Sequence, residues 1–125
     1  MGNKKGSASA QEDEQYGYCS YKELKEGKVK IMTLDSIREL VHPAGLIDID
    51  VEGWEPKVLE GASTILDTSG LLVIAECWDG ETSKKRGFSE SPEEDIVTAM
   101  DTYAGTYERL EDLEDAERNL VSRII

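Results

Sequence analysis

The sequence predicts a single α/β domain, and three stretches favour that class. LIDIDV at residues 46–51 alternates apolar and acidic residues, as a half-exposed strand does. Residues 54–68 then place apolar side chains at helical spacing, and LLVIAEC at 71–77 is nearly continuous apolar sequence. Such a run is expected of a parallel strand covered by helices on both faces. Strand, helix and strand at this length predict a right-handed crossover unit.

The segments before this unit show weaker patterns. Residues 1–15 are small, polar and charged without periodicity, so we expect a disordered arm there. Residues 28–32 alternate lysine with valine and isoleucine, which predicts a short half-exposed strand. Residues 33–41 carry apolar side chains at helical spacing behind Thr33, and this predicts a helix with Thr33 as its N-cap.

The segments after the unit predict a loop, a helix and a tail. Residues 79–89 are polar and predict a loop. A helix over 91–105 follows, with Ser91 as the cap of a capping box and Pro92 in the first turn. In residues 106–125 two short apolar runs flank an acidic segment. Two edge strands and one charged helix both fit, and we favour strands because β-branched residues gather at the end.

The overall charge limits the classes of partner. The chain has 125 residues with 27 acidic and 14 basic side chains, a formal charge of -13. This surplus argues against nucleic acid as a partner and against docking on an anionic membrane. The sequence also shows no apolar run of bilayer-spanning length and no start typical of a signal peptide. We therefore expect a cytoplasmic protein.

Acidic residues gather on one face of the 46–51 strand. Asp48, Asp50 and Glu52 alternate with apolar residues, so they share a face or its continuation into the next loop. A carboxylate buried without a partner costs several kcal/mol, so these groups must reach water, a cation or hydrogen-bond donors. Two interpretations stay open on spacing alone. The acids either accept hydrogen bonds from a helix start or face water at an edge, or they line a ligand crevice beyond the strand ends.

Several motifs in the right order resemble the FkbM-type methyltransferases. The chain reads TLDSI, then DVEGWEPKVLEGA, then LLVIAE, and the best match spans residues 29–77. Carried over by position, the matching residues are Thr33, Leu34, Asp35, Asp50, Val51, Glu52, Gly53, Glu55, Gly61, Ala62 and Glu76.

The resemblance implies a partial enzyme domain over residues 16–125. It implies a Rossmann-like methyltransferase fold, a three-layer αβα sheet, that uses S-adenosylmethionine to methylate a hydroxyl of a sugar or other small molecule. The first cofactor-binding strands and their glycine-rich loop have no counterpart before Thr33. The 46–51 strand would then be an exposed sheet edge, covered by residues 28–32, by a second copy in a homodimer, or by a missing amino-terminal half.

The resemblance also implies roles for site residues. Asp50 or Glu52 would orient or deprotonate the acceptor hydroxyl, and Trp54, Glu76 and Trp78 would shape the acceptor pocket. The same carboxylates are also suited to a divalent cation, because such ions prefer oxygen ligands. The alternative function is a catalytically inactive acidic module that binds a partner through its open sheet edge.

Overall fold

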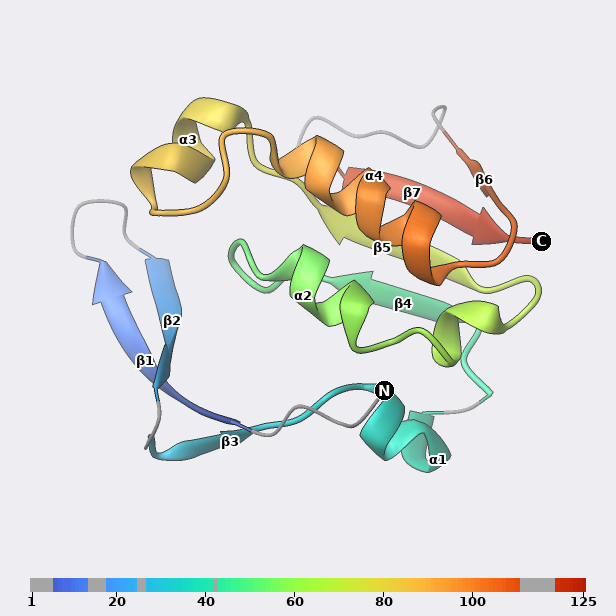
Figure 1. Cartoon of the computed structure of the whole chain (residues 1–125), viewed down its shortest axis with the longest axis horizontal. Coiled ribbons are helices and arrows are strands. Elements are labelled where there is room, and N and C mark those ends of the chain that lie inside the picture. Colours follow the sequence, from blue (N-terminus) through green and yellow to red (C-terminus); the bar gives the residue numbers. More distant parts are fainter. Residues whose placement is uncertain (1–5, 14–17, 25–26, 42, 111–118) are drawn as a thin grey trace.

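The chain folds around a mixed, open four-stranded sheet. The structure is a computed structural model that describes residues 6–13, 18–24, 27–41, 43–110 and 119–125. The sheet has the order β4-β5-β7-β6 (Figure 1). β4 and β5 are parallel, and β7 is antiparallel to both β5 and β6. The strands are β4 (Leu46–Ile49), β5 (Leu72–Glu76), β6 (Tyr107–Arg109) and β7 (Asn119–Ile124). The predicted α/β class and the parallel crossover unit are confirmed.

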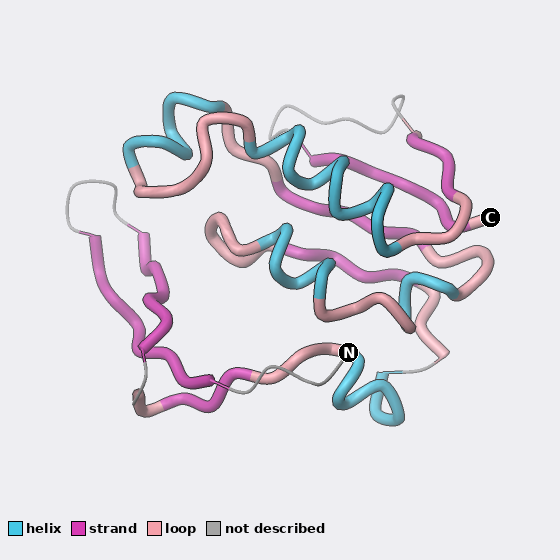
Figure 2. The backbone as a smooth tube through the Cα atoms, viewed as in Figure 1, coloured by secondary structure: helices cyan, strands magenta, loops and turns pink. Residues whose placement is uncertain are grey.

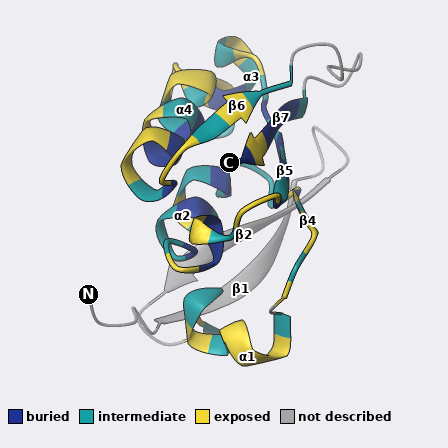
Figure 3. Cartoon of the chain, turned by 90° about the vertical axis from the view of Figure 1, so that its right-hand side faces the viewer, coloured by how far each residue is buried: buried dark blue, intermediate teal, exposed yellow. Residues whose placement is uncertain are grey.

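Helices α2 (Glu55–Glu60) and α4 (Pro92–Tyr103) cover one face of this sheet. Figures 1 and 3 show both helices on the same side, with the buried residues between helices and strands. Leu59 and Leu66 are fully buried there, and Ile96 and Met100 of α4 pack into the same core. Because β4 alternates, its Ile49 joins this core.

Among the described elements, no helix layer covers the other face of β5. Val73 and Ala75 are each 2% exposed, whereas Leu72 and Ile74 are only partly buried. The expected coverage of β5 on both faces, and with it the three-layer arrangement, is therefore not found in the described part of the chain. The apolar run reflects one core face and one half-exposed face, which a sequence pattern cannot distinguish from full burial.

The amino-terminal residues form a second, antiparallel sheet with the order β2-β1-β3. Its strands are β1 (Gly6–Asp13), β2 (Tyr18–Leu24) and β3 (Val29–Ile31), drawn in magenta in Figure 2. A disordered arm over 1–15 is therefore wrong for β1, because paired strands satisfy the backbone hydrogen bonds without large apolar side chains. The predicted strand in 28–32 is confirmed, but it pairs with β1 and does not cover β4.

The helices around β4 are shorter than predicted. Residues 33–41 form a 3₁₀ turn η1 (Asp35–Ile37) followed by α1 (Arg38–Val41), and the Thr33 hydroxyl accepts from the Ser36 N–H as an N-cap does. The predicted 54–68 helix divides into α2 and a 3₁₀ turn η2 (Ile65–Asp67).

A set of capping contacts explains the division, and we call it the capping corner: Thr33, Asp35, Gly61, Ser63, Thr64 and Ile65. The Asp35 carboxylate accepts hydrogen bonds from the Ser63 hydroxyl and from the N–H groups of Thr64 and Ile65 at 3.0–3.2 Å. The Gly61 carbonyl in turn accepts from the Asp35 N–H at 2.9 Å. These bonds end α2 and begin η2.

The carboxyl-terminal half differs from the prediction at two points. Residues 79–89, expected as a loop, contain α3 (Gly80–Lys85), because the Asp79 carboxylate caps the Thr82 N–H at 2.8 Å. α4 begins at Pro92 as predicted, but the Ser91 side chain makes no capping hydrogen bond. The two tail strands are confirmed as β6 and β7, and the acidic segment between them lies outside the described residues from 111 to 118. In the described residues, no helix has the length and apolar character needed to cross a membrane.

Candidate functional site

A strained turn follows β4 and leads into α2. Glu52 has a φ of 54° and Gly53 a φ of 102°, both in the left-handed region. A Cβ on Gly53 would lie 2.8 Å from the Phe88 ring, so this position also needs glycine for space. Strained non-glycine residues gather at functional sites, and Glu52 is such a residue.

The Glu55 side chain holds this turn in place. Its carboxylate accepts from the N–H groups of Val51 and Gly53, both at 3.0 Å, and the side chain is buried at 4% exposure. Burial raises the pKa of Glu55, while the backbone hydrogen bonds act in the opposite direction. Glu55 is therefore a structural acid, and it occupies the donors that an anionic ligand of this turn would need.

Two carboxyl groups meet where β4 and β5 end. Asp50 follows β4 and Glu76 ends β5, so their side chains interact at the adjacent ends of two parallel strands. This contact with Asp50, together with desolvation, raises the pKa of Glu76 to about 7. Two neighbouring carboxyl groups cannot both ionise easily, and this accounts for the raised pKa of Glu76. We call these two residues the acid pair.

A tryptophan and an arginine support the acid pair. The Trp78 indole N–H donates to Glu76 Oε1 at 3.0 Å, and this bond opposes the rise in the Glu76 pKa. The Arg86 guanidinium carbon lies 4.1 Å from the centre of the Trp78 ring, a cation–π contact. Arg86 also pairs with Glu52, with 3.3 Å between Nη1 and Oε2. The Glu52 carboxylate therefore forms an ion pair with Arg86.

Three aromatic rings pack beside the acid pair. Phe88 makes edge-to-face contacts with Trp54 and with Trp78, at centroid distances of 6.0 and 5.8 Å. These rings and Glu76 line a cavity of about 300 Å³ that also contacts the start of α2 and α4. Asp50 is not part of this lining, and it neighbours the cavity only through its interaction with Glu76.

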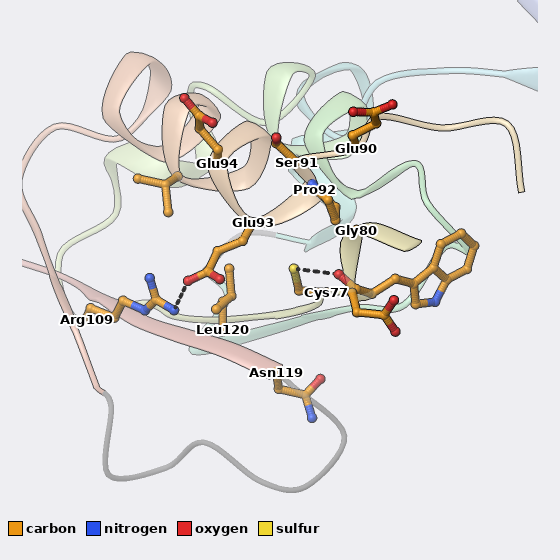
Figure 4. Close-up of a pocket in the computed structure, with 13 residues that line it drawn as sticks. Cys77, Gly80, Glu90, Ser91, Pro92, Glu93, Glu94, Arg109, Asn119 and Leu120 are labelled. Carbon is orange, nitrogen blue, oxygen red and sulfur yellow. Dashed lines mark hydrogen bonds and ion pairs between the residues drawn. The ribbon is translucent and has the colours of Figure 1, made fainter. Parts of the chain in front are cut away.

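A larger cavity of about 710 Å³ lies on the other side of Trp78 and Cys77. Figure 4 shows it between the end of β5, the first turn of α4 and the start of β7. Its Arg109 points to Glu93, with 3.1 Å between Nη2 and Oε1. Because Trp78 lines both cavities, it forms the wall between them.

The structure brings the five predicted site residues into one cluster. Asp50 and Glu76 meet directly, Trp78 contacts Glu76, Glu52 joins through Arg86, and Trp54 joins through Phe88. The other matched motif residues in the capping corner, Thr33, Asp35 and Gly61, support the fold. Sequence reasoning missed Arg86 and Phe88. The sequence gives one hint of their role: Phe88 is a large apolar residue, close to Arg86, within the polar segment 79–89.

In the turn between β4 and α2, the Val51 and Gly53 N–H groups are taken by Glu55, so these two donors are not available to a phosphate or carboxylate group of a ligand. A divalent cation gains no support either, because the described residues hold no group of three or more candidate ligands in metal-binding geometry.

Comparisons with known proteins add no relative. No protein-family model matches the chain, and neither a search of curated proteins nor a search of solved structures found a match.

Proposed function

We propose that this chain supplies the hydroxyl-activating half of an S-adenosylmethionine-dependent methyltransferase that resembles the FkbM type. One observation carries the proposal: the acid pair stands at the carboxyl ends of two parallel strands, beside a cavity lined by aromatic rings. Ligands of open α/β sheets bind beyond these strand ends. The fold is compatible with part of a Rossmann-like domain.

The acid pair has the properties of a general base. A base works best when its pKa lies near the working pH, and the pKa of Glu76 is raised to about 7. In its ionised form the Glu76 carboxylate accepts the proton of an acceptor hydroxyl that lies within hydrogen-bond reach. Glu52 is held by Arg86, so we assign it a positioning role and assign the base to the acid pair.

The cavity beside the acid pair suits the acceptor. Trp54, Trp78 and Phe88 offer apolar surface for a sugar ring or a small molecule, while Glu76 provides the polar contact that orients one hydroxyl. The cofactor supplies the methyl group when it is bound. We assign its binding surface to another polypeptide segment, such as the amino-terminal half that the resemblance implies.

A cofactor-binding experiment tests the proposal. The full chain is purified alone and together with the polypeptide encoded directly upstream, and melting is followed with and without S-adenosylmethionine. We expect stabilisation by the cofactor and transfer of its labelled methyl group to sugar or polyol acceptors when both parts are present. No stabilisation and no transfer in either sample would contradict the proposal.

A second candidate function is favoured by the β4 edge. β4 is an edge strand of the four-stranded sheet, its Leu46 is 55% exposed, and β3 pairs elsewhere. Such an edge accepts a strand from a partner. In this case the upstream polypeptide, or a second copy, would protect the β4 amides from hydrogen exchange without any cofactor effect. Unchanged exchange with both would exclude this role.

A further inference from the structure

The segment after β5 builds one wall of the site although it lies beyond the resemblance. Within it, α3 contributes one fully buried side chain, Ser83, whose hydroxyl donates to the Ser89 carbonyl at 2.5 Å. The Phe88 N–H donates back to the Ser83 carbonyl at 3.0 Å. These hydrogen bonds within the segment hold the end of α3 against residues 88 and 89. The Arg86 and Phe88 side chains extend from this segment toward the ends of β4 and β5.

Arg86 makes two contacts that converge on the acid pair. Its side chain is only 15% exposed, and it holds Glu52 at 3.3 Å while its guanidinium lies 4.1 Å from the Trp78 ring centre. Trp78 in turn donates its indole N–H to Glu76. A continuous series of contacts therefore runs from Arg86 through Trp78 to the Glu76 carboxyl of the acid pair.

We propose that Arg86 is a positioning residue: its stacking on Trp78 and its ion pair with Glu52 hold the Trp78 N–H on Glu76 and fix the geometry of the acid pair. A planar guanidinium can stack on a ring and bind a carboxylate at once, whereas a lysine ammonium cannot do both in the same way. The catalytic meaning of this role rests on the proposed function, but the geometry can be tested without catalysis.

Other groups around Glu76 come from different elements. Asp50 and Glu52 act on Glu76 from the end of β4, and Asn119 is its uncharged cross-strand neighbour on β7. The charged residues that line the same cavity from α2 and α4 are Glu55, Lys57 and Asp95. A substitution of Arg86 leaves these groups unchanged in sequence and removes the support that Arg86 gives to Trp78 and Glu52.

The experiment follows the Trp78 indole N–H by NMR in the ¹⁵N-labelled full chain. The chain has two tryptophans, so its two indole signals can be assigned with Trp54→Phe. In the wild type we expect the Trp78 signal to titrate with the Glu76 carboxyl, at a midpoint near 7.

Arg86→Lys keeps the positive charge but removes the planar guanidinium that stacks on Trp78. Arg86→Gln removes both the charge and the guanidinium. In both variants we expect the pH-dependent shift of the Trp78 signal to fall by about half or more, because a displaced N–H no longer points at Glu76. The midpoint should also rise, since the Trp78 hydrogen bond holds the Glu76 pKa down. Lys85→Gln removes a neighbouring exposed charge, paired with Glu81, and should titrate like the wild type.

A wild-type titration in Arg86→Lys would overturn the proposal, because charge alone would then be sufficient. If neither Arg86 variant folds, Glu52→Gln releases Arg86 from the other side and should reduce the same shift, and a wild-type titration there would also overturn it. An altered titration without methyl transfer would contradict only the proposed function. Methyl transfer with an unchanged Arg86→Lys titration would contradict only the role of Arg86.

Discussion

The capping corner and the acid pair both consist of residues that match the same family motifs, yet they use their carboxylates differently. The Asp35 carboxylate accepts hydrogen bonds from three donors of the fold. Asp50 and Glu76 lie at adjacent strand ends, and Glu76 lines a cavity. Both sites match the same motifs, so the motif match does not distinguish a structural acid from a candidate base. The hydrogen-bond partners of each carboxyl group do.

The largest expected effect comes from removing one member of the acid pair. Asp50→Asn should lower methyl transfer by about 10²–10⁴-fold, the usual contribution of a general base. Melting should remain close to that of the wild type, because Asp50 is exposed. Initial rates measured with the assembled enzyme check this.

Asp48→Asn is the matched control for that variant. It makes the same chemical change two residues earlier, at another exposed position on β4. Equal rates in the two variants would show that Asp50 has no special role.

The next effect concerns the turn that carries Glu52. Gly53→Ala should destabilise the fold by about 2–4 kcal/mol, because it adds backbone strain at φ 102° and a clash with Phe88. Gly70→Ala is the control, since Gly70 has a φ of 82° but open space around it, and it should cost about 1 kcal/mol. Denaturant unfolding gives both values, and equal losses would exclude the Phe88 contact.

Substitutions in the capping corner should lower the stability of the fold without lowering methyl transfer. Asp35→Ala removes a cap from the Thr64 and Ile65 N–H groups and should cost about 1–2 kcal/mol. Methyl transfer per folded molecule should stay unchanged, as should stability in the exposed control Glu39→Ala. A loss of transfer in fully folded Asp35→Ala would assign this corner to the site after all.

The smallest effect is a pH dependence of stability. Because the folded-state pKa of Glu76 is raised, its stabilising contribution is fully present below about 4.5 and is lost as the pH rises through about 7. Glu76→Gln should therefore gain melting temperature relative to the wild type over this range. Burial also raises the pKa of Glu55. Some pH dependence of the melting temperature should therefore persist in Glu76→Gln. Parallel melting curves at every pH would contradict this.

Much of the fold could be predicted from Leu46 onward, because strand alternation and helical spacing are local patterns. Two elements could not. β1 has no apolar pattern and forms through backbone pairing, and α3 buries one serine, so it has no apolar stripe to detect. The division of α2 depends on Asp35, which is 26 positions from Gly61 in sequence.

The candidate site was predicted in part for a similar reason. Asp50 and Glu76 could be placed together because parallel strand ends meet at one edge. Arg86 enters through a contact with Glu52 that spans 34 residues, and neither periodicity nor a motif predicts such a contact.

The most direct test of the account is an NMR titration of the Glu76 side-chain carboxyl in the wild type and in Asp50→Asn. We expect a midpoint near 7 in the wild type that falls toward 4.5 in the variant, because Asp50 is the main cause of the raised Glu76 pKa. A wild-type midpoint near 4.5, or one near 7 that Asp50→Asn leaves unchanged, would contradict the existence of the acid pair.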